Sequence, residues 1–223
     1  MRDGDSALRH PHFSRYAINR FIHRVCQTEM TLILASGSSI RLAMLGAAGV
    51  PVAVDPADID ESAIKATHDG DDVALALALA EAKALEISRR APENWVIGGD
   101  SLVTVDGRRF DKPVSRDDAA DHLRLFSGKQ MRLTSAVALA RCGAIDWSHA
   151  EQATLSIRLL SDDFIHTYLN AEWPAVSYCV GVFRMEGRGV TLFDRVEGDH
   201  FTILGMPLLP LLGALRERGL VAA

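Results

Sequence analysis

The chain has 223 residues, which is enough for one large α/β domain or two small lobes with a buried core. Hydrophobic residues make up 48% of it, charged residues 24%, and the formal net charge is −5. This balance excludes a global basic field, so we expect no stable nucleic-acid binding and no attraction to an anionic membrane. No stretch reaches the roughly 20 apolar residues that a membrane-spanning helix needs.

The three cysteines, Cys26, Cys142 and Cys179, are widely spaced and form no CxxC pair. An odd number at such spacing argues against a disulfide framework or a zinc site. The eight histidines form no HExxH motif either. We therefore expect a reduced, cytoplasmic setting.

The first 29 residues are richer in Arg and His than the rest of the chain. They lack the apolar core and the small-residue cleavage site of a signal peptide. We interpret residues 1–29 as an N-terminal extension, either disordered or the product of an over-extended translation start. A nucleic-acid-binding arm is the sharper alternative. We expect residues 30–223 to form a single domain.

The first predicted elements form a strand, a turn and a helix. Residues 31–36 (TLILAS) predict a short strand that ends in small residues. Apolar residues then recur at helical spacing over residues 36–50, with serines for the N-cap and Gly49 for the stop. Residues 50–61 predict a second strand that leads into an acidic loop.

A long alanine-rich helix is predicted next, over residues 71–90, with aspartates at its start and arginines at its end. Residues 95–105 (WVIGGDSLVTV) are apolar almost throughout, which predicts a central strand buried on both faces. Asp106-Gly107 is typical of a hairpin turn.

The rest of the chain alternates between helical and strand patterns, without a repeat or an obvious linker. The predicted helices cover residues 115–128, 161–170 and 209–220, and the predicted strands cover 130–141, 151–160 and 189–196. Two lobes that share one sheet are therefore favoured over two independent domains.

Two loops carry polar groups that suit phosphate or metal. A strand, a serine-rich turn and a helix N-terminus make an anion site, which Ser36, Ser38 and Arg41 would line. Ordinary helix capping explains the same residues. The acidic loop ends in Asp60 and Glu61, whose oxygens suit Mg²⁺, or which form a solvated loop.

Asp100 is the most informative single residue. A carboxylate embedded in a buried strand costs several kcal/mol unless it is paired, hydrogen-bonded or metal-bound. We interpret it as functional, at the end of an apolar run where α/β sheets place ligands. Lys112 lies one hairpin away. Lys83, alone on its alanine-rich helix, either reaches a phosphate or forms a polar helix face.

Six segments resemble the Maf family of septum-formation-inhibitor-like nucleoside triphosphate pyrophosphatases in order and approximate spacing. They are LILASGSSIR, ADIDE, LALAEAKA, GGDSLVTVDGRRFDKP, HLRLFSGK and EGDHFTILGMPL. The resemblance runs from about Met30 to the C-terminus, and the tail is most similar to alphaproteobacterial Maf-like proteins.

The resemblance implies an ITPase-like α/β fold, in which an elongated mixed sheet is flanked by helices and a cleft separates two lobes. It implies hydrolysis of nucleoside or deoxynucleoside triphosphates, including modified ones such as methylated GTP, to the monophosphate and pyrophosphate. A divalent metal is implied, Mg²⁺ first and Mn²⁺ or Co²⁺ as alternatives. A homodimer is compatible with it.

Residue by residue, the resemblance implies that Asp100 is the general base and that Asp100 and Glu61 assist the metal. Lys83 and Lys112 match the two catalytic lysines of the family. The predicted substrate-binding residues are Ser36, Ser38, Arg41, Ser101 and Glu186.

The chain also departs from the family's pattern. Ile40 stands where many members have a second arginine, and Glu186 stands where many have glutamine. A carboxylate at 186 either binds metal or accepts hydrogen bonds from a base edge that offers donors. These departures leave open a catalytically weak, nucleotide-binding regulator of cell division. A doubly wound binding domain unrelated to Maf is a third reading, which leaves the shared order of motifs unexplained.

Overall fold

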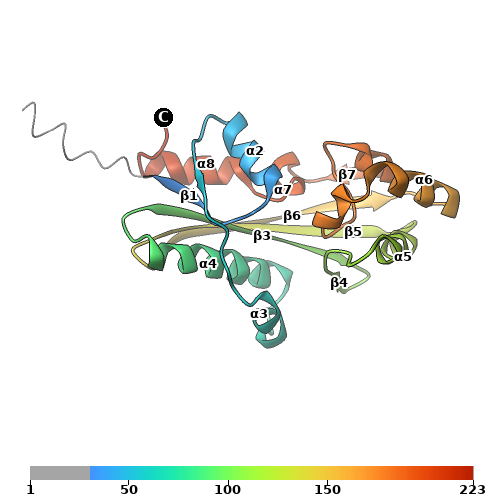
Figure 1. The fold of residues 1–223 in the computed structure, drawn as a ribbon, viewed down its shortest axis with the longest axis horizontal. Coiled ribbons are helices and arrows are strands. Elements are labelled where there is room, and N and C mark those ends of the chain that lie inside the picture. The colour runs from blue at the N-terminus through green and yellow to red at the C-terminus, as the bar shows by residue number, and fades with distance from the viewer. Residues whose placement is uncertain (1–30, 223) are drawn as a thin grey trace, which may run out of the picture. The chain divides into compact units, whose positions relative to one another are not determined.

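The computed structural model describes residues 31–222, and the expected N-terminal extension at residues 1–29 lies outside them. One mixed sheet runs through the described residues in the order β2-β1-β3-β5-β6-β7, and β4 pairs with β3 beside that path (Figure 1). The strands are β1 Leu32–Leu34, β2 Ala53–Val54, β3 Trp95–Val105, β4 Arg108–Phe110, β5 Gln130–Arg141, β6 Ala144–Ile157 and β7 Phe193–Glu197.

Helices cover both faces of this sheet. They are α2 Ser39–Ala47, α3 Glu61–Thr67, α4 Asp72–Arg90, α5 Arg116–Phe126, α6 Asp162–Glu172, α7 His200–Ile203 and α8 Leu208–Glu217, with short 3₁₀ helices η1 Ala175–Tyr178 and η2 Arg188–Leu192. The predicted α/β fold, a mixed sheet flanked by helices, is confirmed. Within residues 31–222 no helix has both the length and the apolar character needed to cross a membrane.

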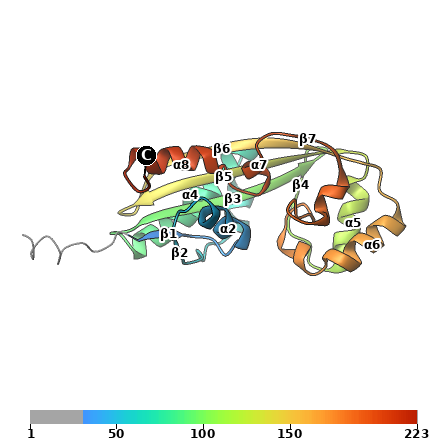
Figure 2. The same ribbon diagram turned by 90° about the horizontal axis from the view of Figure 1, so that it is seen from above.

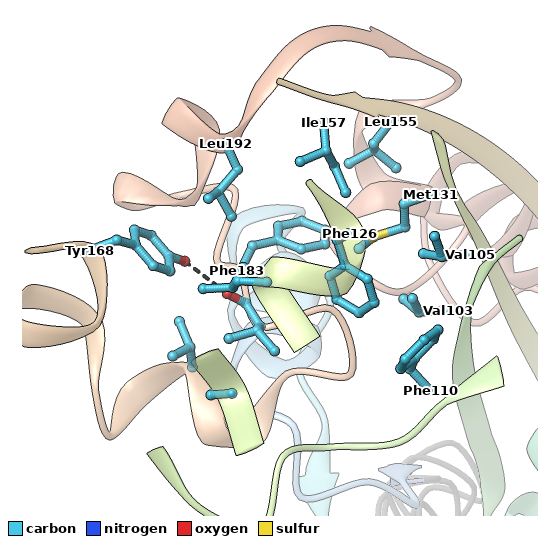
Figure 3. Close-up of a cluster of buried hydrophobic side chains, with 14 of the residues drawn as sticks. Val103, Val105, Phe110, Phe126, Met131, Leu155, Ile157, Tyr168, Phe183 and Leu192 are labelled. Carbon is cyan, nitrogen blue, oxygen red and sulfur yellow. Dashed lines mark hydrogen bonds between the residues drawn. The ribbon is translucent and has the colours of Figure 1, made fainter. Parts of the chain in front are cut away.

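The helices gather at two ends of the sheet (Figure 2). At one end α2 and α8 pack with β1 and the start of β3 around Leu34, Leu45 and Ile97. At the other end α5 and α6 pack on the far halves of β3, β5 and β6. Figure 3 shows this second cluster, in which Phe126 and Phe183 lie among aliphatic side chains of the strands. Two separately packed ends agree with the predicted lobes on one sheet.

Helix α4 covers the opposite face of β3 and β5, and it lies unusually close to β3. A Cβ atom on Gly98 would lie 2.1 Å from the carbonyl oxygen of Ala80 and 2.8 Å from the amide nitrogen of Ala84. Only glycine fits at this contact, and only small residues fit on the facing side of the helix. The alanine-rich pattern of residues 71–90 therefore serves close packing on a strand.

The single strand predicted over residues 95–105 is confirmed, since β3 is continuous and pairs with β5 from residue 96 to residue 105. Two other predictions about local structure were wrong. Glu61 does not end a loop but begins α3, since Asp60 accepts a hydrogen bond from the amide of Ala63 and caps a helix. Residues 188–192 form η2 instead of the start of a strand, because the backbone at Gly189 turns tightly against Arg184.

Candidate active site

Asp100 lies beside a stretch of strand edge that has no neighbouring strand. On this edge β1 pairs with residues 95–97 and β4 pairs with residues 103–105, so residues 98–102 face no strand there. Asp100 is at the centre of the gap and is 7% exposed. The gap opens at the carboxyl end of β1, which runs parallel to β3. Ligands approach α/β sheets at such positions.

Three predicted site residues meet at this gap and form what we call the acid–lysine cluster: Asp100, Lys83 and Glu61. The Nζ atom of Lys83 lies 2.6 Å from Oδ1 of Asp100 and 2.7 Å from Oε1 of Glu61. Lys65 adds a second cation, 3.8 Å from Oε2 of Glu61 and 2.6 Å from Oδ1 of Asp111. The cost of burying Asp100 is therefore offset by an ion pair with Lys83.

Local structure places these side chains by simple geometry. Asp100 and Gly98 point to the same face of β3, since they are two residues apart in a strand. Gly98 admits α4 to close contact, and Lys83 precedes Ala84, whose backbone touches that glycine. Glu61 reaches the same lysine because Asp60 caps α3, so that the helix begins at Glu61.

The charge state of Glu61 follows from its surroundings. Burial raises the pKa of Glu61, but the hydrogen bond and charge of Lys83 outweigh burial, with help from Lys65 and Lys112. The pKa of Glu61 therefore lies below its ordinary value, and the side chain is ionised at neutral pH. The cluster thus presents two carboxylates held by cations.

Arg41 forms a second group of contacts on the other face of β3. Its Nε donates to the carbonyl of Gly205 at 2.9 Å, and its Nη1 donates to Ser36 Oγ at 3.1 Å and to the Gly99 carbonyl at 2.9 Å. Its Nη2 donates to Ser101 Oγ at 3.1 Å. These four bonds leave one of the five guanidinium N–H groups free.

Arg41 is therefore engaged chiefly with the protein itself. The Gly99 carbonyl lies on the edge of β3 where β1 has ended, so the guanidinium takes the place of a missing strand. Burial lowers the pKa of Arg41, while the negative charges of Asp100 and Glu61 raise it. Arg41 therefore interacts electrostatically with the two carboxylates of the acid–lysine cluster.

The serine turn before α2 has a capping role and an open donor set. Ser38 caps the helix by accepting from the amide of Arg41, and Ser36 Oγ accepts from the amide of Ser38. The first turn of α2 carries no acidic residue. Within the described residues the amides of Ser39 and Ile40 have no acceptor. The turn thus keeps the features of an anion site.

Lys112 and Glu186 lie apart from both groups of contacts. Lys112 is exposed just after β4 and forms no hydrogen bond or ion pair with any described residue. Its charge nevertheless acts on Glu61 and on the thiol of Cys179. Glu186 pairs with Arg184, whose Nε lies 3.2 Å from Oε1 of Glu186. No contact joins Glu186 to Asp100.

Sequence reasoning missed several partners of these residues. Lys65 was detectable, because it follows Glu61 at the i,i+4 spacing of helical ion pairs. Gly205 was not, since 164 positions separate it from Arg41. Glu172, which lies beside Arg184, gave no signal either.

A shallow polar depression lies elsewhere on the molecule, at the start of α4 beside the open face of β3 and β5. Its lining residues are Asp71, Asp72, Val73, Thr104, Gly107, Arg109, Arg132 and Gln152. None of the predicted site residues lines it. The ion pair between Arg109 Nε and Asp72, at 2.6 Å, already neutralises much of the charge in this depression. The buried ion pair between Lys83 and Asp100 makes the acid–lysine cluster the better candidate site.

Comparison with known proteins identifies the family of this chain. A family model described as Maf-like protein matches residues 31–218. A protein of Sphingopyxis alaskensis named nucleoside triphosphate pyrophosphatase is 48% identical over 195 residues, which cover 86% of this chain and 98% of that protein. A protein of Rhizobium etli named 7-methyl-GTP pyrophosphatase is 45% identical over 193 residues, which cover 85% and 97%.

Among solved structures, a HAM1 protein from Coxiella burnetii is similar over 57% of this chain and 73% of its own, at 14% identity and a TM-score of 0.39. The family model spans most of the chain, and the curated relatives exceed 40% identity over nearly their whole length. The chain therefore belongs to the Maf family.

Proposed function

We propose that this chain is a nucleoside triphosphate pyrophosphatase, which hydrolyses its substrate to the monophosphate and pyrophosphate. The observation that carries the proposal is the acid–lysine cluster at the unpaired edge of β3. A buried carboxylate that pairs with a lysine beside an unpaired strand edge suits the deprotonation of an attacking water. The names of the relatives support the same reaction.

Asp100 is the general base in this proposal. Lys83 contacts only Oδ1, and no described residue forms a hydrogen bond with Oδ2. Oδ2 therefore remains to accept the proton of a water molecule that attacks the α-phosphorus.

The cations and the serine turn bind the triphosphate. Lys112 is exposed and unpaired within the described residues, so it can meet phosphate without first breaking an ion pair. Lys83 neutralises charge between the two carboxylates, and Ser36 and Ser38 present hydroxyls at the start of α2. Developing charge on the leaving pyrophosphate is stabilised by such groups.

Asp100 and Glu61 suit a divalent metal of the Mg²⁺ type. Among residues 31–222 there is no group of three or more His, Cys, Asp or Glu side chains that would hold a metal alone. Two carboxylates completed by substrate phosphates and water are, however, a common way to hold Mg²⁺. The metal would supply charge neutralisation on the phosphates, and Mn²⁺ or Co²⁺ suits the same oxygen donors.

The proposed substrates include modified purine nucleotides. Glu186 is a carboxylate and accepts hydrogen bonds only, so it favours a base edge that presents N–H donors, as guanine does. A relative named 7-methyl-GTP pyrophosphatase supports this class. The two described cysteines are free thiols, which supports a cytoplasmic location. A homodimer stays a prediction.

A product assay tests the proposal. Wild type and Asp100→Asn would be incubated with Mg²⁺ and a panel of standard, deoxy and methylated nucleoside triphosphates, and monophosphate and pyrophosphate would be measured. We expect both products from wild type and a rate lower by about 10²–10⁴-fold in the variant. Equal rates would remove Asp100 from the base role. Binding without any product would favour the regulator of division, to which Ile40 and Glu186 point.

A further inference from the structure

Two residues of α6 hold the segment that carries Glu186. Tyr168 donates from its hydroxyl to the carbonyl of Val182 at 2.9 Å (Figure 3). Val182 has a φ of 57°, in the left-handed region that β-branched residues rarely adopt. Such strain persists only where the surroundings enforce it, and it concentrates at functional segments. The second residue is Glu172, one helical turn after Tyr168.

Glu172 has an incomplete set of partners. Its side chain is only 9% exposed. Its Oε1 accepts from the amide of Arg188 at 3.4 Å, but its buried Oε2 has no hydrogen-bond partner. The carboxylate faces Gly187, where a Cβ atom would lie 3.4 Å from Oε2. A buried carboxylate oxygen without a donor is costly, so this position needs an explanation.

Arg184 stands between this carboxylate and Glu186. Its Nε lies 3.2 Å from Oε1 of Glu186, while its Nη1 lies 3.8 Å from Oε2 of Glu172. The first contact is a hydrogen bond and the second is a looser ion pair. A small movement of the guanidinium toward Glu172 would satisfy the unpaired oxygen and release Glu186.

We propose that Glu172 is a positioning residue, which receives Arg184 when Glu186 turns to the N–H donors of a nucleobase. The proposal rests on the proposed function, because it assigns Glu186 to the base end of the same nucleotide. Arg184 keeps Glu172 as its carboxylate partner when Glu186 leaves, so base binding does not leave the guanidinium unpaired. Glu172 also fixes the backbone at Arg188, which holds the segment in register for the exchange.

Lys112 connects the two ends of the nucleotide in this scheme. Its charge acts on Glu61 at the acid–lysine cluster and on Cys179, whose thiol also senses Glu186 and Glu172. In this scheme the phosphates lie near Lys112 and the nucleoside extends toward residues 179–188. Glu186 contacts the base in the proposal, and Glu172 acts only through Arg184 and the segment.

The test compares two ligands that differ in the base. Calorimetry would measure the dissociation constants of α,β-methylene GTP, which resists cleavage at the α-phosphorus, and of inorganic tripolyphosphate, which has no base. Glu172→Gln keeps an acceptor for Arg188 but lacks the charge that receives Arg184. We expect this variant to raise the dissociation constant of α,β-methylene GTP about tenfold, as loss of one charge-assisted contact does. The dissociation constant of tripolyphosphate should stay within about twofold of the wild-type value.

A double-mutant cycle distinguishes coupling between Glu172 and Glu186 from a purely structural role of Glu172. Glu186→Gln alone should weaken binding of α,β-methylene GTP. Adding Glu172→Gln to that variant should change the affinity little further, since Arg184 no longer has to leave a carboxylate at residue 186. Tyr168→Phe loosens the same segment without altering charge, and its effect should add to that of Glu186→Gln.

Several outcomes would overturn the inference. They are equal weakening of both ligands by Glu172→Gln, no weakening of either, or full additivity with Glu186→Gln. Binding of both ligands by a wild type that turns over no nucleotide would remove only the proposed hydrolysis. Failure of the wild type to bind either ligand would remove the proposed function and this inference together.

Discussion

The ammonium nitrogen of Lys83 lies 2.6 Å from Oδ1 of Asp100, with 13% and 10% of the two side chains exposed. The lysine comes from α4 and the aspartate from β3, so the contact depends on how closely the helix packs on the strand. A buried ion pair is favourable only while both partners are present. Stability and chemistry are therefore coupled at this contact.

Lys83→Met should lower the free energy of unfolding by about 3 kcal/mol, since it leaves the Asp100 carboxylate buried without a cation. Urea unfolding measures this change. Adding Asp100→Asn should recover most of the loss, because the uncompensated charge is then removed. A double variant as unstable as the single one would show that the lysine stabilises the fold by packing and not by pairing.

Gly98→Ala should destabilise the chain and reduce turnover together. The added Cβ would meet the backbone of α4 at Ala80 and Ala84, so the helix must move and carry Lys83 away from Asp100. Gly46→Ala in α2 is the matched control, since a Cβ added there would meet nothing within 4 Å. It should stabilise the chain by about 0.5–1 kcal/mol. Thermal unfolding of both variants measures these changes. A Gly98→Ala variant with wild-type stability would contradict the close packing of α4 on β3.

Arg41→Lys should lower stability, because an ammonium group cannot reproduce a fork that bonds Ser36, Gly99, Ser101 and Gly205. Loss of two or more such bonds costs about 1–3 kcal/mol in urea unfolding. An unchanged unfolding curve with weaker tripolyphosphate binding would instead make Arg41 a direct phosphate ligand.

Lys112→Ala should show the opposite pattern. The side chain is exposed and makes no ion pair within residues 31–222, so the midpoint of urea unfolding should equal that of wild type. Binding of tripolyphosphate should weaken about tenfold, as loss of a charged contact does, and calorimetry measures it. Lys129→Ala is a control, because that lysine already pairs with Asp106. Equal effects of the two variants would indicate a general charge effect.

Long, regular patterns were predictable from the sequence. The strand expected over residues 95–105 has those bounds, and the helix expected over 71–90 begins one residue later, at Asp72. The hairpin at Asp106-Gly107 was confirmed, with φ of 50° and 76° at the two residues. Glycine, aspartate and unbroken apolar runs signal such elements locally.

Short elements and distant contacts were not predictable. Helices α3 and α7 have 7 and 4 residues, too few for a periodic pattern to stand out. The resemblance grouped Asp100, Lys83 and Glu61, but it did not say which atoms pair. The unpaired edge of β3 arises only because β1 and β4 pair with different parts of that strand, residues 95–97 and residues 103–105. The contact of Arg41 with phosphate stays a prediction.

The lowered pKa of Glu61 predicts how stability depends on pH. Burial raises this pKa, and the hydrogen bond and charges of Lys83, Lys65 and Lys112 lower it further than burial raises it. A carboxyl whose pKa is lower in the folded state adds stability above its ordinary value of 4.5. That stability is lost as the pH falls through the folded value.

Glu61→Gln should therefore be less stable than wild type at about pH 7, and the difference should shrink as the pH is lowered toward about 3, because the carboxyl then becomes protonated in the folded state as well. Because 41% of the Glu61 side chain is exposed, solvent screens the pair and the difference should stay below about 1 kcal/mol. Thermal unfolding at the two pH values measures it, and Glu93→Gln, at an exposed glutamate outside the cluster, is the control. A difference that grows toward acid would show that burial, and not Lys83, dominates at Glu61.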